Sequence, residues 1–148
     1  MIEAGFDLTE LDQFNKDMLE LADKTMPNET KKFIRRQGAK LERNLKNAYK
    51  TRVGKKTGNL QKGVGRGAPT QYEGDWQIRV WNAAPHAHLI EHGHVMKDHK
   101  GNPIRNKFGE EVWVEGKYVT AFTVNDFKRT YPDAVDEFID QVLEKGLK

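Results

Sequence analysis

Residues 30–50 read TKKFIRRQGAKLERNLKNAYK, and this pattern predicts an amphipathic helix. One side carries small and apolar residues at three- or four-residue spacing: Ile34, Gly38, Leu41, Leu45 and Ala48. The remaining faces carry eight cations, which are the candidate interaction residues: Lys31, Lys32, Arg35, Arg36, Lys40, Arg43, Lys46 and Lys50. Such a helix packs through one face and offers a cationic surface to a partner.

The charge of the whole chain is segregated around this helix. Residues 31–66 contain 13 Lys or Arg and a single acid, Glu42. The rest of the chain has 12 basic and 21 acidic residues, which leaves a net charge of +3. Segregation of this kind indicates binding to nucleic acid, binding to an acidic partner surface, or pairing between copies of the chain.

Outward from this helix, the pattern predicts further helices on both sides and short strands between. An earlier helix over residues 8–25 has an apolar stripe of Leu8, Leu11, Phe14, Met18 and Leu21, and Pro27 is expected to end it. A last helix over residues 125–145 contains Pro132, which is expected to kink it or to begin a separate helix. Between these helices, four strands are predicted, at residues 60–67, 76–82, 111–114 and 117–124. A long loop or hairpin arm is predicted at 93–110.

The order of these elements predicts an α+β fold in one domain, residues 1–148. Two N-terminal helices occupy a helical region at about 8–50. A small, mainly antiparallel sheet with a long loop occupies about 57–124. The C-terminal helix occupies about 125–145.

The composition gives little support to enzyme chemistry. The chain has no cysteine and no serine, so thiolate metal sites and two common nucleophiles are excluded. No stretch approaches the roughly 18 apolar residues that a membrane span requires, so no membrane partner is expected. The acids of the last helix are interpreted as a solvated face. We therefore predict a protein that is not an enzyme and has no catalytic residue and no cofactor.

The histidines offer one alternative. All five lie between His86 and His99, and His88, Glu91 and His92 fit the H-x-x-E-H pattern of a zinc hydrolase. Pro85 and Gly93 leave this segment barely two helical turns. The favoured interpretation is a solvated group of histidines with no metal site.

Two short motifs indicate a family. Lys56-Thr57-Gly58-Asn59-Leu60 follows the basic helix, and Ala87-His88-Leu89-Ile90-Glu91-His92-Gly93 comes some 28 residues later. Their order resembles the small head–tail joining proteins of long-tailed bacteriophages and prophages, the minor tail-component or tail-completion family. Members have an amphipathic helical region, a K-T-G-x-L turn, a strand, a Y-A-x-x-[IV]-E-x-G segment and a C-terminal helix.

The second motif keeps the family's Ala87, Ile90, Glu91 and Gly93, with His86 in the place of an aromatic residue. Farther on, the family's P-x-x-F-L-x-P-A pattern is replaced by residues 114–122, which resemble a branch with a longer loop. Each motif also has a local interpretation. In the first, Thr57 and Asn59 are expected to form hydrogen bonds with nearby backbone, Gly58 to take positive φ and Leu60 to anchor the following strand. In the second, Glu91 is expected to accept backbone hydrogen bonds and Gly93 to allow a sharp turn into the loop.

The resemblance implies a virion structural protein at the head–tail junction, made in the bacterial host cytoplasm. It implies a ring-like homo-oligomer that contacts connector, adaptor and tail proteins, with DNA as a further contact if the ring has a lumen. In the ring, the basic face of residues 31–56 is expected to meet an acidic face of another copy, either on the helix at 8–25 or on the last helix. The loop at 94–113 is the expected contact arm, through its apolar residues Ile104, Phe108, Val112 and Trp113. The alternative is a nucleic-acid-binding module that uses the basic segment 31–66. A zinc hydrolase that uses His88, Glu91 and His92 is a third interpretation, ranked below it.

Overall fold

One long helix forms the axis of the molecule. The computed structural model describes residues 8–53 and 58–146. In it, α1 (Leu8–Glu20) continues through a π-helical turn, η1 (Leu21–Thr25), into α2 (Met26–Arg52). The prediction that Pro27 ends the first helix is therefore wrong. Pro27 lies in the first turn of α2, where a missing N–H is tolerated, and Met26 N–H donates to the Leu21 carbonyl five residues back.

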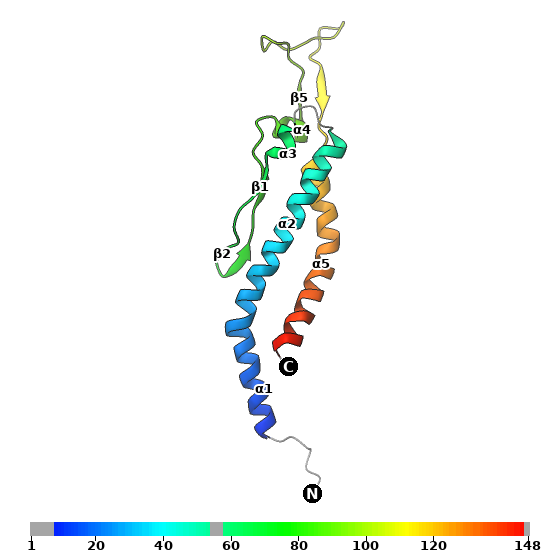
Figure 1. The fold of residues 1–148 in the computed structure, drawn as a ribbon. Coiled ribbons are helices and arrows are strands. Elements are labelled where there is room, and N and C mark those ends of the chain that lie inside the picture. The colour runs from blue at the N-terminus through cyan, green and yellow to red at the C-terminus, as the bar shows by residue number, and fades with distance from the viewer. Residues whose placement is uncertain (1–7, 54–57, 147–148) are drawn as a thin grey trace.

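The second long helix, α5 (Val119–Gly146), packs antiparallel beside α2 (Figure 1). It begins six residues before the predicted start, so the strand predicted at 117–124 is wrong from Val119 onward. Pro132 lies inside this single helix and does not begin a separate one.

The strands form three two-stranded antiparallel ladders. β1 (Val64–Arg66) pairs with β4 (Val80–Asn82), and β2 (Thr70–Tyr72) pairs with β3 (Asp75–Gln77). The strand predicted at 76–82 is thus divided between two ladders. The strand predicted at 60–67 starts late, because a short helix, α3 (Asn59–Lys62), precedes β1.

The third ladder forms the root of a hairpin arm. β5 (Gly93–Val95) pairs with β6 (Trp113–Glu115), with Gly93 opposite Glu115. The strand predicted at 111–114 is therefore shifted by one to two residues. The loop or hairpin arm predicted at 93–110 is present as a hairpin.

Two apolar clusters hold the elements together. The lower cluster joins α1–α2 to α5 through Leu21, Phe33, Phe138 and Val142. The upper cluster joins α2, β1 and α5 through Leu45, Tyr49, Val64 and Val119. Of the stripe predicted on residues 8–25, Leu21 is buried whereas Phe14 and Met18 are exposed, and the side chains of Leu8 and Leu11 lie outside the described part.

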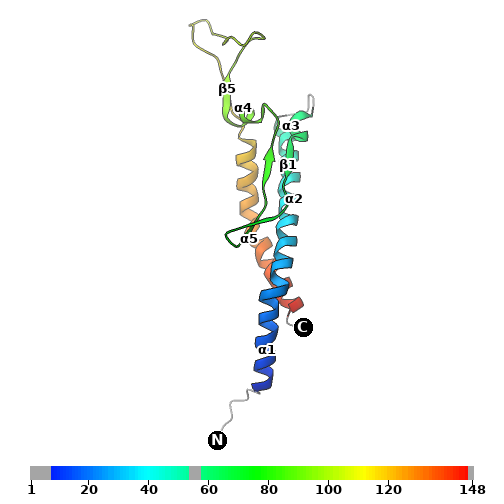
Figure 2. The same cartoon turned by 90° about the vertical axis from the view of Figure 1, so that its left-hand side faces the viewer.

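The molecule is elongated. Figures 1 and 2 show the arm at one end, which we call the upper end, and α1 extending past the end of α5 at the other, the lower end. The accessible surface is 11289 Å², well above the roughly 7,700 Å² expected of a compact monomer of this mass. Among the described residues, no helix is both long and apolar enough to cross a bilayer. Much of this surface is consequently open to partners.

Candidate interaction surfaces

The root of the arm is fixed by Glu91, which lies in α4 (Ala87–His92). Its carboxylate oxygens accept hydrogen bonds from the backbone N–H groups of Thr120, at 2.8 Å, and Ala121, at 2.9 Å. The first N–H groups of a helix have no partner within the helix, and a carboxylate there also interacts favourably with the helix dipole. The expected role of Glu91 as a backbone acceptor is confirmed, and it sets the start of α5.

Two glycines allow the chain to cross itself at this root. Gly93 has φ +85° and ψ 171°, a conformation that side chains disfavour, and a Cβ there would come within 2.5 Å of the Val114 carbonyl oxygen. A Cβ on Gly116 would collide with the Glu91 carbonyl oxygen. The sharp turn expected at Gly93 is therefore present, and the close crossing of the chain there fixes the direction in which the arm projects.

Backbone hydrogen bonds continue into the arm beyond its root. Met96 N–H donates to the Val112 carbonyl at 2.8 Å, and Val112 N–H donates to the Ile104 carbonyl at 3.0 Å. Two turns form its outer part. The Asp98 carboxylate accepts N–H groups in the first turn, and the Asn106 side-chain oxygen does so in the second. The arm is ordered by its own local hydrogen bonds.

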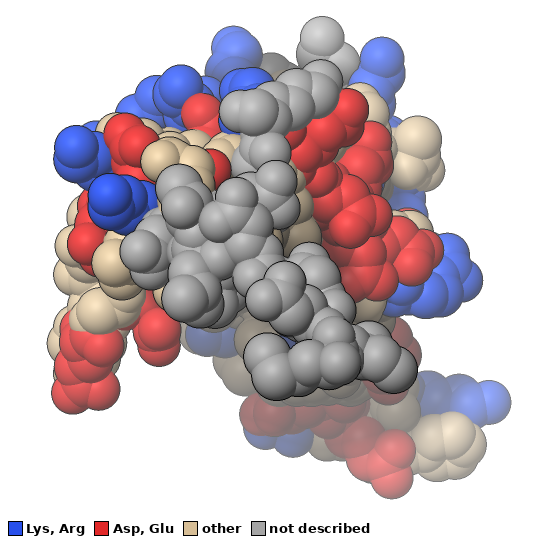
Figure 3. Space-filling model, turned by 90° about the horizontal axis from the view of Figure 1, so that it is seen from below, with Lys and Arg blue, Asp and Glu red and all other residues tan. Residues whose placement is uncertain are grey.

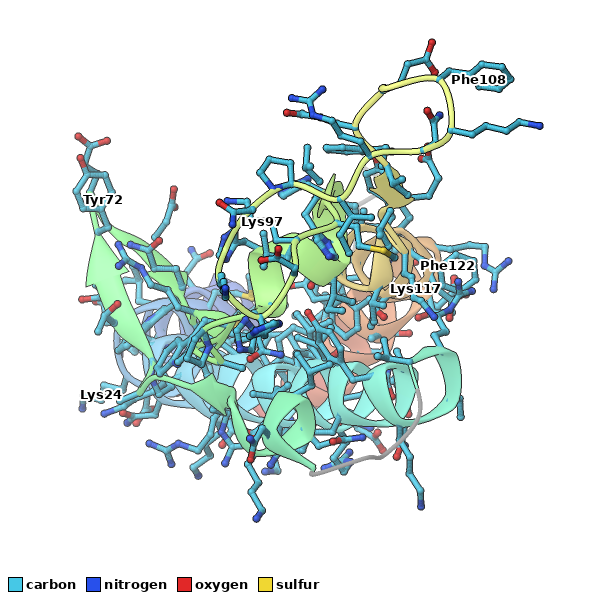
Figure 4. All side chains as sticks on the ribbon, turned by 90° about the horizontal axis from the view of Figure 1, so that it is seen from above. Lys24, Tyr72, Lys97, Phe108, Lys117 and Phe122 are labelled. Atoms are coloured by element: carbon cyan, nitrogen blue, oxygen red, sulfur yellow. The ribbon has the colours of Figure 1, made fainter. Side chains whose placement is uncertain are left out.

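The apolar side chains predicted to make contacts lie along this arm. Phe108 is 73% exposed, Trp113 52% and Ile104 37%, while Val112 is half-buried. Figure 4 shows Phe108 at the outer end, pointing away from the rest of the molecule. Exposed apolar groups concentrated on one projecting element mark a contact surface more often than scattered ones do.

The cations of α2 divide into two sets. Six lie along the solvent-facing side of the helix and form what we call the basic stripe: Lys32, Arg35, Arg36, Arg43, Lys46 and Lys50. The other two lie at its edges, with Lys31 Nζ 5.8 Å from the centre of the Trp76 ring and Lys40 Nζ 6.0 Å from that of Phe127. The stripe is therefore narrower than the eight-residue face predicted from the sequence.

Most cations of the basic stripe lack a counter-ion within the chain. Lys46 pairs with Glu42 at 3.0 Å and Lys32 with Glu29 at 3.5 Å. Within residues 8–53 and 58–146, no acid pairs with the stripe's other four: Arg35, Arg36, Arg43 and Lys50. This positive charge is available to a partner.

A second charged surface follows the outer side of α5. Its members, which we call the acidic stripe, are Asp126, Asp133, Asp136, Glu137, Asp140 and Glu144. Asp126 pairs with Arg129, whereas Asp133, Asp136 and Asp140 meet no cation in the described part of the chain. Seen from below, acidic side chains gather together on the right, the side on which α5 lies in Figure 1 (Figure 3).

The two family motifs lie beside the upper cluster. Lys56 and Thr57 fall outside the described residues, Gly58 has the expected positive φ of 79°, and Asn59 begins α3. Leu60 and Ile90 pack against the upper cluster, and Ala87 is buried. Residues of both motifs line a cavity of about 480 Å³. The motif residues that the structure describes therefore serve mainly to join α3 and α4 to the helices.

The histidines do not gather into a metal site. Nowhere in the described residues do three His, Asp or Glu side chains come close enough to hold a metal ion. Both oxygens of Glu91 are engaged by the backbone of α5, and the His92 ring packs edge-on against Tyr118. Of the residues in this pattern, Glu91 caps α5.

No family model, curated protein or solved structure matches this chain. The basis for a function is therefore the set of surfaces described above, together with the short motifs.

Sequence reasoning missed two features of these surfaces. The acids of α5 were interpreted as a solvated face and as one of two expected partners of the basic face in another copy. Their regular spacing was missed: Asp126, Asp133 and Asp140 stand seven residues apart, which aligns side chains along a helix. A groove of about 380 Å³ between α2 and α5 also gave no signal, because polar residues line part of it. The Gln37 side-chain oxygen is buried in this region without a hydrogen-bond partner.

Proposed function

We propose that this chain is a structural protein at the head–tail junction of a phage or prophage. It acts there by oligomeric assembly and by contacts with connector, adaptor and tail proteins, and it carries out no catalysis. Its place is the virion, after synthesis in the host cytoplasm. The observation that carries the proposal is the ordered arm, which presents Ile104, Phe108 and Trp113 to solvent.

The construction of the arm supports this role. The Glu91 cap and the crossing of Gly93 and Gly116 hold its base against α5, so binding does not have to order the arm first. Large apolar side chains on an arm that is already ordered favour a stable protein–protein contact. The motifs Lys56–Leu60 and Ala87–Gly93, which resemble those of head–tail joining proteins, point to the junction as its place.

Nucleic-acid binding is the second candidate, because the basic stripe carries four cations without counter-ions among the described residues. Binding of this kind usually adds aromatic rings for stacking. Tyr49, the aromatic residue at the end of the basic helix, is 1% exposed and its hydroxyl bonds Thr120. We therefore rank this function below protein contacts, and a zinc hydrolase below both.

The proposed function is tested in the phage or prophage that encodes the chain. Deleting the gene is expected to give heads and tails that remain separate in electron micrographs, and the unchanged gene supplied in trans restores joined particles. A variant with Ile104→Ser and Phe108→Ser is expected not to restore them. Tyr72→Ser is the matched control, since Tyr72 is 64% exposed at the tip of another hairpin.

Each outcome of this experiment has a definite meaning. Joined particles without the gene would overturn the head–tail role. Full restoration by the Ile104→Ser/Phe108→Ser variant would overturn the arm as the contact that carries it. Amounts of each variant in the lysate are measured, so that loss of joining is compared at equal protein level.

A further inference from the structure

The basic and acidic stripes have the same length and the same repeat. In the basic stripe, Arg36, Arg43 and Lys50 stand seven residues apart, and in the acidic stripe Asp126, Asp133 and Asp140 do so. At 1.5 Å per residue, both repeats are about 10.5 Å. Lys32 to Lys50 and Asp126 to Glu144 each span about 27 Å by the same measure. We propose that the basic stripe docks on the acidic stripe of a second copy of this chain.

Within one copy, the two stripes lie mostly on different faces of the molecule. α2 and α5 pack against each other through Phe33, Phe138 and Tyr131, and most members of each stripe lie on the outward face of their helix. The exceptions are Arg36 and Glu137, which both line the groove between the two helices. Figure 3 shows acidic side chains on one side of the lower end and lysine and arginine side chains along an adjacent side. Four cations of the basic stripe and three aspartates of the acidic stripe, unpaired among the described residues, are therefore available to another molecule.

The proposed contact joins two different surfaces of the chain. A surface on α2 that meets a different surface on α5 makes a heterologous contact, which leaves one stripe free at each end of a growing chain of subunits. Such contacts close into a ring if the rotation between copies allows it and otherwise extend as a filament. A two-fold dimer is the other possible arrangement, in which each basic stripe lies on the partner's acidic stripe and assembly stops at two copies.

Apolar residues beside the acidic stripe add to the contact. Ile139 is 41% exposed and Leu143 37%, and both flank the acids on the lower half of α5. Ala39 lies within the basic stripe, between Arg36 and Arg43, and adds a small apolar surface there. An isolated exposed ion pair adds little to affinity, so a row of pairs with adjoining apolar burial is the form that a stable contact takes. Salt must weaken it.

The proposal is tested with the full chain by measuring mass across protein concentration, at low and high ionic strength. The unchanged chain is expected to form species of several times 17.0 kDa at low salt and to lose them as salt rises. Arg36→Glu/Arg43→Glu and Asp133→Lys/Asp140→Lys are each expected to stay monomeric. Lys62→Glu/Arg79→Glu changes the net charge as the first variant does, outside the stripe, and is expected to assemble. Circular dichroism checks that every variant keeps its helices.

Mixing supplies the decisive measurement. The first variant keeps an unchanged acidic stripe and the second keeps an unchanged basic stripe, and the substituted positions of the other two stripes are also complementary. An equimolar mixture is therefore expected to assemble when neither variant does alone. The four-fold variant that exchanges both pairs is expected to assemble by itself. An unchanged chain that stays monomeric at low salt, or a mixture that does not assemble, overturns the proposal.

Duplex DNA is titrated in parallel to test the other partner class. If Arg36→Glu/Arg43→Glu abolishes DNA binding but leaves self-association unchanged, the stripe is a nucleic-acid surface and the proposal is wrong. The inference does not rest on the head–tail role, because particle joining and the mass of the purified chain are measured separately. Failure of the particle-joining experiment and failure of the mass measurement can therefore be told apart.

Discussion

Glu91 connects parts of the chain that lie far apart in sequence. It belongs to α4, yet its carboxylate caps α5 about 29 residues later, at Thr120 and Ala121. Its own backbone carbonyl accepts a hydrogen bond from Tyr118 N–H at 3.2 Å. One side chain thus holds α4, the root of the arm and the start of α5 in a fixed relation.

Removing this cap tests its importance. Glu91→Ala is expected to lower the free energy of unfolding by about 1–2 kcal/mol, because two N–H groups at the start of α5 lose their acceptor. Urea denaturation measures the change. Glu115→Ala is the control, since Glu115 is exposed on the same arm and should change stability by no more than about 0.5 kcal/mol. Equal effects of the two variants would contradict the capping role.

Gly93 tests the crossing at the root of the arm. Gly93→Ala is expected to destabilise the fold by more than Gly101→Ala, although both glycines have positive φ. At Gly101 a Cβ meets nothing within 4 Å, so only backbone strain of about 1–2 kcal/mol applies. At Gly93 the clash with the Val114 carbonyl adds to that strain. Melting temperatures of the two variants give the comparison, and similar losses would rule out a tight crossing.

At the scale of elements, the sequence pattern correctly predicted those helices and hairpins whose formation depends on nearby residues. The helix over 30–50 and the hairpin arm follow from periodicity and turn residues, and both are present. The start of α5 does not follow in this way, because residues 117–124 are rich in the β-branched and aromatic residues that favour strands. They become helical from Val119, where the distant Glu91 caps the helix. Pro27 was expected to end a helix, but the π-helical turn before it removes the usual conflict.

The two prolines in helices differ in what surrounds them. Pro132 lies exposed in the interior of α5, where proline costs about 3 kcal/mol relative to alanine. Pro132→Ala is therefore expected to raise the free energy of unfolding by about 1–3 kcal/mol. Pro27→Ala should change it less, since Pro27 lies in a first turn after η1. Chemical denaturation of both variants measures this, and a larger gain from Pro27→Ala would contradict it.

At the scale of the whole molecule, the sequence indicated the α+β class but not the division of the core. The lower cluster around Phe138 and the upper one around Tyr49 are separate along the two long helices. Between them Gly38 brings α2 close to Ile78, and a Cβ there would lie 2.5 Å from Ile78 Cδ1. A single domain remains a prediction, and two clusters suggest that the ends open independently.

Amide hydrogen exchange tests this division. Phe138→Ala removes a buried ring, a change that costs about 3–5 kcal/mol in a packed core. Exchange is expected to accelerate by roughly two to four orders of magnitude around the lower cluster and much less around Tyr49 and Val119. Leu45→Ala should give the reverse pattern. Uniform acceleration in both variants would mean that the helices open as one cooperative unit.

The π-helical turn at η1 has a mechanical consequence. The unbroken helix from Leu8 to Arg52 is about 65 Å long, so it behaves as a lever with η1 near one third of its length. A bend of about ten degrees at η1 displaces the far end of α2 by roughly 7 Å relative to α1, given about 1.5 Å of length per residue. In a subunit that is bound by partners at α1 and at the arm, a small change of helical register at η1 would therefore move the two bound ends relative to each other by several ångströms.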